Sequence, residues 1–145
     1  MHISTAKNMP KPLFVDTAFV IALLNAKDSY HGVACKLSVD VESHPLITTD
    51  AVLLEIGNAL AKGFKREAVE VIEQFIASED VEIVHLSQEL FKKAFQLFKR
   101  HSDKDWSLVD CCSFVVMKEN RLTQALTCDK HFSQAGFEPL MRFTV

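Results

Sequence analysis

Several features that mark special classes of protein are missing from this sequence. None of the four cysteines stands in a C-x-x-C pair, and Cys111 is followed directly by Cys112. Adjacent cysteines suit a disulfide framework poorly, so we expect reduced, buried thiols in a cytoplasmic protein. No internal repeat and no low-complexity tract occurs along the chain. These absences argue against a secreted domain held together by disulfides.

The sequence also lacks an uncharged apolar run that is long enough to span a membrane. The stretch 13–24 follows two lysines and could be mistaken for the core of a signal peptide. Asp16 interrupts it, and the pattern downstream makes it part of the fold. We therefore expect a cytoplasmic protein with no membrane partner.

An excess of positive charge is missing as well. The formal net charge is −3 and the pI is about 6.0. Any binding to nucleic acid must therefore depend on a local group of cations, although such residues more often form an ordinary solvated face. The candidate RNA-contacting cations are Lys62, Lys65, Arg66, Arg100 and Lys104.

One domain is expected from the length of 145 residues, which is enough to bury a substantial core. The hydrophobic fraction of 48% argues against disorder. The polar start of the chain is interrupted by proline. We predict a loose lead-in at 1–11 and a folded domain at 12–145.

Short apolar runs that stop at an acid recur along the chain. Asp16, Asp50 and Asp129 each follow such a run and precede a helical pattern. Strands that alternate with helices predict an α/β fold, with a mostly parallel central sheet covered by helices on both faces. The three junctions should lie at one edge of that sheet, where open α/β sheets bind ligands.

The spacing of apolar residues gives approximate bounds for each element. Strands are predicted at 13–15, 46–48, 81–86, 123–127 and 138–143. Helices are predicted at 17–26, 33–39, 50–61, 65–77, 88–98, 107–118 and near 130–132.

Four acids follow or lie near the expected strand ends. Asp16 and Asp129 come directly after strands, Asp110 lies in the first turn of a helix, and Glu55 lies about a turn and a half into another. Parallel topology can bring them to one site. Each also has a structural explanation: the aspartates can cap helices, Asp110 in a capping box with Ser107, and Glu55 can be an exposed helix residue. For any single acid both explanations remain open.

Clustered carboxylates repel one another, so protonation or a cation must neutralise them. All-oxygen ligands favour Mg²⁺ or Mn²⁺ over zinc. A hard cation on an open edge activates water and clamps phosphate oxygens, which supports hydrolysis of a phosphodiester. The hydroxyls of Thr17 and Ser107 could orient water or ligands there, and each can equally cap a helix.

The histidines and three phenylalanines receive a structural interpretation. The histidines, His131 among them, are scattered without metal-ligand spacing, so we assign them to surface or core packing. Phe91, Phe95 and Phe98 recur with helical spacing, so we assign them to the core or to an interface.

Four segments together resemble a known family, the PIN-domain ribonucleases, and especially the small VapC-type toxins. They are 14–17 (FVDT), 48–60 (TTDAVLLEIGNAL), 105–114 (DWSLVDCCSF) and 126–132 (LTCDKHF), with Gly136-Phe137 after the last. Each segment is weak alone, but their order and separations are specific. The resemblance spans 13–140, and the lead-in at 1–11 is a departure from it.

The resemblance implies a single PIN-like domain and a Mg²⁺- or Mn²⁺-dependent endoribonuclease, the toxin of a toxin–antitoxin pair. Its substrate would be RNA, and its partner would be a small antitoxin protein. By resemblance, the acidic quartet that holds the metal is Asp16, Glu55, Asp110 and Asp129. The supporting residues are Thr17, Ser107 at the family's hydroxyl position, and Asp105.

Two other functions remain open: a related metal nuclease acting on DNA, and a non-catalytic module that binds through an acidic pocket. Nucleases that act on DNA ends or flaps usually carry more acids and a helical arch, and no insertion here is long enough for one. A receiver domain would need a paired acid at the first strand end, where Asp16 stands alone.

The amphipathic helices predicted at 50–61 and 65–77 carry more apolar surface than one sheet face needs. A homodimer, or a groove for the antitoxin, would bury that surface. We therefore expect these two helices to form an interface.

Overall fold

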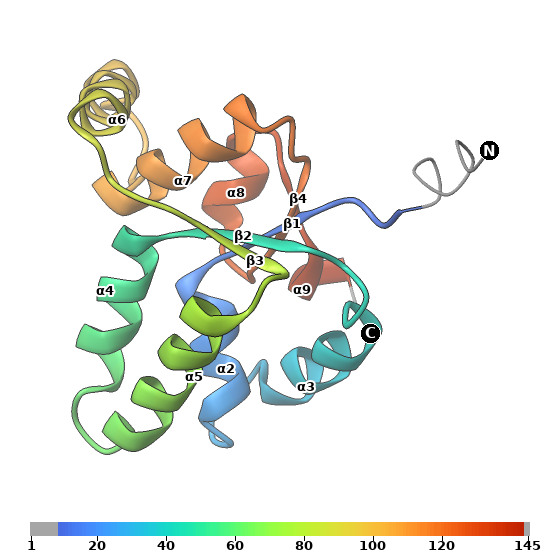
Figure 1. Ribbon diagram of the computed structural model, residues 1–145. Helices are drawn as coiled ribbons and strands as arrows, with labels where there is room; N and C mark the ends of the chain where they lie inside the picture. The colour runs from blue at the N-terminus through green and yellow to red at the C-terminus, as the bar shows by residue number, and fades with distance from the viewer. Residues whose placement is uncertain (1–8, 144–145) are drawn as a thin grey trace.

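Five parallel strands form one sheet in the computed structural model, which describes residues 9–143. The strands are β1 (Leu13–Val15), β2 (Leu46–Thr49), β3 (Val81–Val84), β4 (Gln124–Leu126) and β5 (Glu138–Pro139). Their order across the sheet is β3-β2-β1-β4-β5 (Figure 1). Most of the expected lead-in at 1–11 and the last two residues lie outside the described part of the chain.

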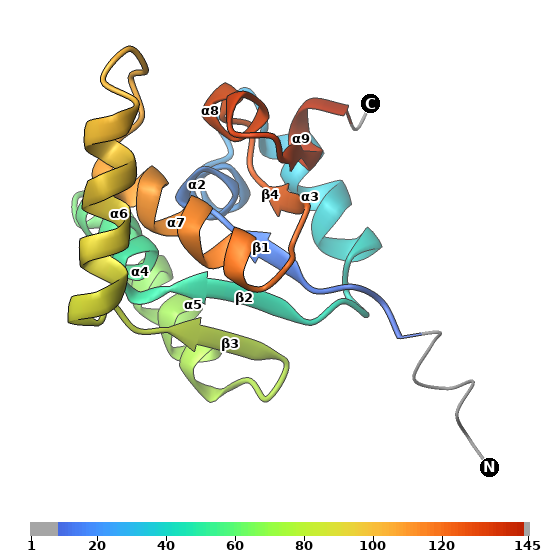
Figure 2. The ribbon, with the colours of Figure 1, turned by 90° about the horizontal axis from the view of Figure 1, so that it is seen from above.

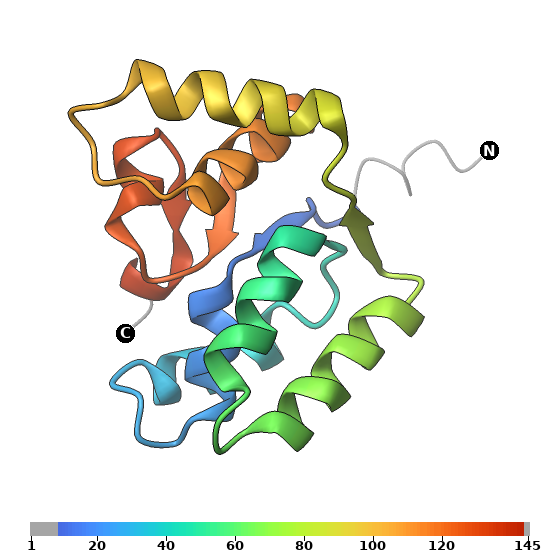
Figure 3. The same ribbon diagram turned by 90° about the vertical axis from the view of Figure 1, so that its left-hand side faces the viewer.

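Helices cover both faces of this sheet, as the sequence predicted. They are α2 (Thr17–Leu24), α3 (His31–Asp40), α4 (Asp50–Leu60), α5 (Lys65–Ala77), α6 (Gln88–Arg100), α7 (Leu108–Glu119), α8 (Lys130–Gln134) and α9 (Leu140–Phe143). Helices α2 to α5 lie on one face, and α6, α7 and α8 lie on the other (Figures 1 and 3). The predicted α/β class with a parallel sheet is therefore confirmed.

Strand β1 lies in the middle of the sheet because each of its residues can be buried. Leu13, Phe14 and Val15 are all at most 1% exposed. A strand covered by helices on both faces has no solvent side, so it carries a continuous apolar run instead of an alternating one. Thr17 begins α2 directly after the acid that ends this run.

The order of the strands reverses next to β1. The chain proceeds outward from β1 to β2 and β3, and then returns to place β4 and β5 on the other side of β1 (Figure 2). Open α/β sheets bind ligands at such a switch point, beyond the carboxyl ends of the strands. The amide of Asp16 donates to the carbonyl of Leu126 at 3.2 Å, so the ends of β1 and β4 are held together there.

A chain of aromatic contacts fixes α7 and α8 against β1. The ring of Phe132 lies 6.3 Å from that of Phe14 and 5.0 Å from that of Phe114, centroid to centroid. Trp106 makes an edge contact with Phe114 at 5.0 Å. Such pairs contribute about 0.5–1.5 kcal/mol each beyond the burial of their area. The contacts join the middle of α7 and the start of α8 to β1.

The end of the chain differs from the prediction of a strand at 138–143. Strand β5 stops at Pro139, and Leu140 begins a short helix. Proline has no amide hydrogen for a sheet ladder and is confined to edge strands or strand starts. The amide of Met141 instead donates to the carbonyl of Thr127 at 3.1 Å, and its side chain is buried.

Smaller differences concern α3 and the cysteines. Helix α3 begins at His31, two residues earlier than predicted. All four cysteines are free, as expected, but Cys35 and Cys128 are only partly buried. The prediction of reduced, buried thiols is therefore confirmed for the absence of disulfides among the described residues. It is confirmed only in part for burial.

A buried serine on α7 generates a test of the packing. The hydroxyl of Ser113 is fully buried and has no hydrogen-bond partner among residues 9–143. Leaving such a group unpaired costs about 1–3 kcal/mol. We expect Ser113→Ala to raise the free energy of unfolding by about 1 kcal/mol in urea titrations.

The matched control is the serine that begins the same helix. Ser107 forms a capping box with Asp110, so Ser107→Ala should lower the free energy of unfolding by about 1 kcal/mol. A loss of stability in Ser113→Ala comparable to that in Ser107→Ala would contradict the prediction.

Candidate metal centre

Asp16 lies between β1 and α2 and is only 5% exposed. It occupies the N-cap position of α2, as the sequence allowed, but its side chain makes no capping hydrogen bond within the described residues. One carboxylate oxygen, Oδ2, instead accepts from the hydroxyl of Thr127 at 2.7 Å. The carboxylate is therefore directed across to the end of β4.

The electrostatic surroundings of Asp16 disfavour its charge. Burial raises the pKa of its carboxyl from 3.8 to about 7, against the lowering effect of the Thr127 hydroxyl. The negative charges of Asp110 and Glu55 contribute to this raised pKa. Since this charge effect falls with distance, it places three of the four predicted acids near one another.

Asp110 and Asp129 do have the capping roles that the sequence left open. Asp110 Oδ2 accepts from the amide of Ser107 at 3.0 Å, which completes a capping box on α7. Asp129 Oδ1 accepts from the amide of His131 at 2.8 Å and caps α8. Capping holds each carboxylate at the start of its helix, and it does not exclude binding to a further group.

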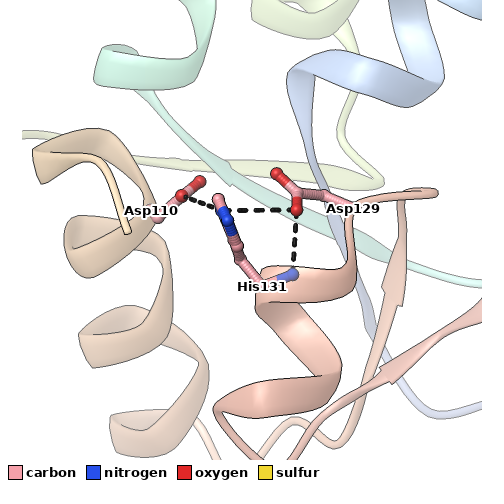
Figure 4. A group of neighbouring side chains, drawn as sticks. All are labelled: Asp110, Asp129 and His131. Atoms are coloured by element: carbon pink, nitrogen blue, oxygen red, sulfur yellow. Dashed lines mark hydrogen bonds and ion pairs between the residues drawn. The ribbon is translucent and has the colours of Figure 1, made fainter. Parts of the chain in front are cut away.

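His131 joins these two acids. Its Nδ1 lies 3.0 Å from Asp110 Oδ2 and 3.3 Å from Asp129 Oδ1 (Figure 4). The ring comes from the first turn of α8 and points between the two carboxylates. A nitrogen and two oxygens from two helices thus lie within 4.8 Å of one another.

Thr127 connects this group to Asp16. Its hydroxyl donates to Asp16 and accepts from the amide of Asp129 at 3.0 Å. Thr127 is fully buried at the end of β4. Its single hydroxyl therefore fixes the relative positions of Asp16 and Asp129.

Glu55 reaches the site from α4 and is partly buried. Its carboxylate accepts a hydrogen bond from the hydroxyl of Thr17. Thr17, one of the predicted supporting residues, therefore contacts one of the four predicted acids. Glu55 also lines a hollow of about 350 Å³, together with apolar residues of α4, α6 and α7.

Two other acids do not join the cluster. Asp50 begins α4, but its carboxylate accepts from the amide of Leu86 at 2.9 Å and lies 3.2 Å from Nδ1 of His85. Asp105 is exposed, and within the described residues no hydrogen bond or ion pair connects it to the four acids. Of the acids on α4, it is therefore Glu55, further along the helix, and not Asp50 that lies near the other predicted acids.

The predicted cations fall into two groups. Lys62, Lys65 and Arg66 lie at the turn between α4 and α5, and Arg100 and Lys104 lie at the end of α6 and in the following loop. All five are exposed. In Figure 3 the two segments lie on opposite sides of the N-terminal ends of α2 and α7.

The donor set suits a hard divalent cation. The acids are carboxylates from four separate segments, and at least three of them interact electrostatically. Within the described residues the group that could hold an ion is Asp110, Asp129 and His131. A larger hollow of about 620 Å³ between α6 and α7 contains none of the four acids.

Two residues of this cluster were not predicted. His131 was assigned to packing, although its position two residues after Asp129 on the same helical turn was a usable signal. Thr127 gave no signal, because a threonine near the end of a buried strand is common. The contacts made by both residues depend on the tertiary structure.

The helices contain no membrane-crossing candidate within residues 9–143, since none is both long and apolar enough.

Comparisons with known proteins agree with this fold. The 23S rRNA-specific endonuclease VapC20 of Mycobacterium tuberculosis, from strains CDC 1551 / Oshkosh and ATCC 25618 / H37Rv, is 33% identical over 125 residues, which cover 86% of this chain and 95% of the relative. The crystal structure of VapC20 from that organism, described as a Sarcin-Ricin loop cleaving toxin, superposes with a TM-score of 0.78 and 34% identity, covering 86% of this chain and 95% of that one.

The family model described as PIN domain matches residues 13–138, from the first strand to the last. The match covers the segments that carry all four acids of the predicted quartet. This chain belongs to the PIN-domain family.

Proposed function

We propose that this chain is an endoribonuclease that depends on a divalent metal ion. The proposal rests on the convergence of Asp16, Asp110 and Asp129 beyond the ends of β1 and β4, with Asp16 buried beside like charges. Such crowding costs free energy that a bound cation would offset. The similarity to a protein named as an endonuclease, over 95% of that protein's length, supports the same activity.

Asp16, Asp110 and Asp129 would hold the ion, and Glu55 would complete the site or position a water. A divalent cation bound there supplies Lewis acidity, which activates water and offsets negative charge on a phosphate. Oxygen donors suit Mg²⁺ or Mn²⁺.

Hydrogen bonds from two hydroxyl groups and one backbone amide hold these carboxylates before a substrate arrives. Thr127 fixes Asp16, Thr17 fixes Glu55, and Ser107 fixes Asp110 through the capping box. Groups that are already oriented need no reorganisation when charge develops in the transition state. The supporting residues would thus act by positioning.

RNA is the proposed substrate because the relatives are named for cleavage of 23S rRNA and of the sarcin–ricin loop. An RNA that contains this loop is therefore the first to test, beside DNA of the same sequence. Lys62, Lys65 and Arg66 on one side of the acids, with Arg100 and Lys104 on the other, are proposed to contact its phosphates.

A small antitoxin and a second copy of the chain are the proposed protein partners. Exposed apolar side chains on three helices need a partner to cover them. They are Leu54, Val69 and Ile76 on α4 and α5, and Phe91, Phe95 and Phe98 on α6. The three phenylalanines are exposed, so of the two explanations given for them, core or interface, we keep the interface. The proposed interface then includes α6 as well as α4 and α5.

The substitution Asp110→Asn tests the metal site. Asparagine keeps an oxygen that can accept from Ser107, while the lost charge relieves repulsion with Asp16. We expect the metal-free variant to melt at the same temperature as the parent or slightly higher. It should lose RNA cleavage and most of the stabilisation gained from Mg²⁺ or Mn²⁺, because a ligand stabilises according to its affinity for the native state.

The matched control is Asp50→Asn, which alters an acid at the start of another helix outside the cluster. This variant should keep cleavage and the full response to metal in the same melting experiments. An Asp110→Asn variant that is destabilised by about 1 kcal/mol and still responds fully to metal would favour a capping role alone.

The raised pKa of Asp16 predicts how metal-free stability depends on pH. Between its unfolded pKa of 3.8 and its folded pKa of about 7, the folded protein binds more protons than the unfolded protein. The free energy of unfolding should therefore fall as pH rises from about 4 to about 7, by about 1.4 kcal/mol per unit of pKa difference, and this contribution should level off above pH 7.

Metal affinity should show the opposite trend, because ions compete with the proton on Asp16. It should rise up to about pH 7 and then level off. Asp16→Asn should remove the fall in stability that Asp16 causes, as measured by urea titrations at several pH values. Identical stability profiles for the variant and the parent would contradict the assignment.

A further inference from the structure

We propose that His131 is a direct ligand of the divalent ion, which makes this site prefer a first-row transition ion such as Mn²⁺ over Mg²⁺. This inference rests on the proposed function, since it concerns the same metal centre. It adds a nitrogen to a ligand set that the sequence predicted to be all oxygen.

The spacing of the three candidate ligand atoms carries the inference. His131 Nδ1 lies 3.0 Å from Asp110 Oδ2 and 3.3 Å from Asp129 Oδ1, and all three atoms lie within 4.8 Å of one another. Ligands about 2.1 Å from an octahedral ion are about 3 Å apart at adjacent corners. The two nitrogen–oxygen distances match that separation.

The backbone around His131 holds the ring in this position. The amide of His131 donates to Asp129 Oδ1, which fixes the first turn of α8. The next residue, Phe132, is fully buried and packs against Phe14 and Phe114. The side chain of His131 is 19% exposed, so it lines the accessible edge while its main chain is anchored. Figure 4 shows the ring directed between the two carboxylates.

The imidazole ring is the source of the proposed metal selectivity. Carboxylates suit Mg²⁺ and Mn²⁺, whereas imidazole suits transition ions better than Mg²⁺. A mixed set of nitrogen and oxygen donors therefore shifts the preference away from Mg²⁺. The competing explanation is that His131 only bridges the two carboxylates by hydrogen bonds and leaves ion selection unchanged.

Calorimetric titration of the full chain with Mn²⁺ and with Mg²⁺ separates these explanations. His131→Ala should weaken Mn²⁺ binding by about tenfold or more, since removing even an outer partner of a metal site costs 10–100-fold in affinity. Mg²⁺ binding should weaken much less, so the preference for Mn²⁺ should fall. Equal weakening for both ions would support the bridging explanation and overturn the proposal.

The control is His85→Ala, because His85 also contacts an aspartate but lies outside the cluster. It should leave both affinities unchanged. A similar loss of the Mn²⁺ preference in His85→Ala would overturn the assignment to His131.

Pulsed electron paramagnetic resonance of bound Mn²⁺ gives a readout that does not require the variant to fold. Protein labelled with ¹⁵N-histidine should show a nitrogen coupling to Mn²⁺. The other histidines of the described part have partners elsewhere in the fold or lie outside the cluster: His31, His44, His85 and His101. Where His131→Ala folds, the coupling should be absent from it.

The outcomes separate this inference from the proposed function. Mn²⁺ binding could depend on Asp110 and yet show no nitrogen coupling. That result would overturn His131 as a ligand and leave the nuclease proposal intact. A parent protein that binds neither Mn²⁺ nor Mg²⁺ would overturn both.

Discussion

The carboxylate of Asp16 is buried beside two other acids, and the rest of the site depends on how the fold tolerates this. Burial and the charges of Asp110 and Glu55 raise its pKa to about 7. One hydrogen bond from Thr127 offsets part of that cost. A protein with no use for the charge would be more stable with an apolar or neutral residue at this position. We therefore interpret Asp16 as a group retained for binding, at some expense in stability.

The fold supplies this cluster through the strand order and through helix capping. The later strands are added on the opposite side of β1 from β2, so β1 and β4 are parallel neighbours. Their carboxyl ends therefore meet, which places Asp16 beside Asp129. Asp110 and Asp129 cap α7 and α8, so the interactions that begin these helices also fix their carboxylates. Capping and metal binding are therefore compatible roles for the same residue, although the sequence presented them as alternatives.

The sequence predicted the elements and the acids better than it predicted the contacts between them. Local apolar spacing is sufficient for β1, α4 and α5, and α4 also has a side-chain cap from Thr49. Two features depend on how the whole chain packs and not on local sequence. They are the exposure of Phe91 on α6 and the end of β5 at Pro139. The ring of His131 contacts Asp110 only because α7 and α8 pack together, since the two residues are distant in sequence.

The central claim is that carboxylates from separate segments hold one divalent ion at the switch point of the sheet. A crystal of the protein soaked in Mn²⁺ and measured near the manganese absorption edge tests it directly. We expect an anomalous peak within about 2.0–2.3 Å of carboxylate oxygens of Asp110 and Asp129, with Asp16 in the same coordination sphere or one water away. A crystal saturated with Mn²⁺ that shows no peak there, or a peak only at other acids, would contradict the claim.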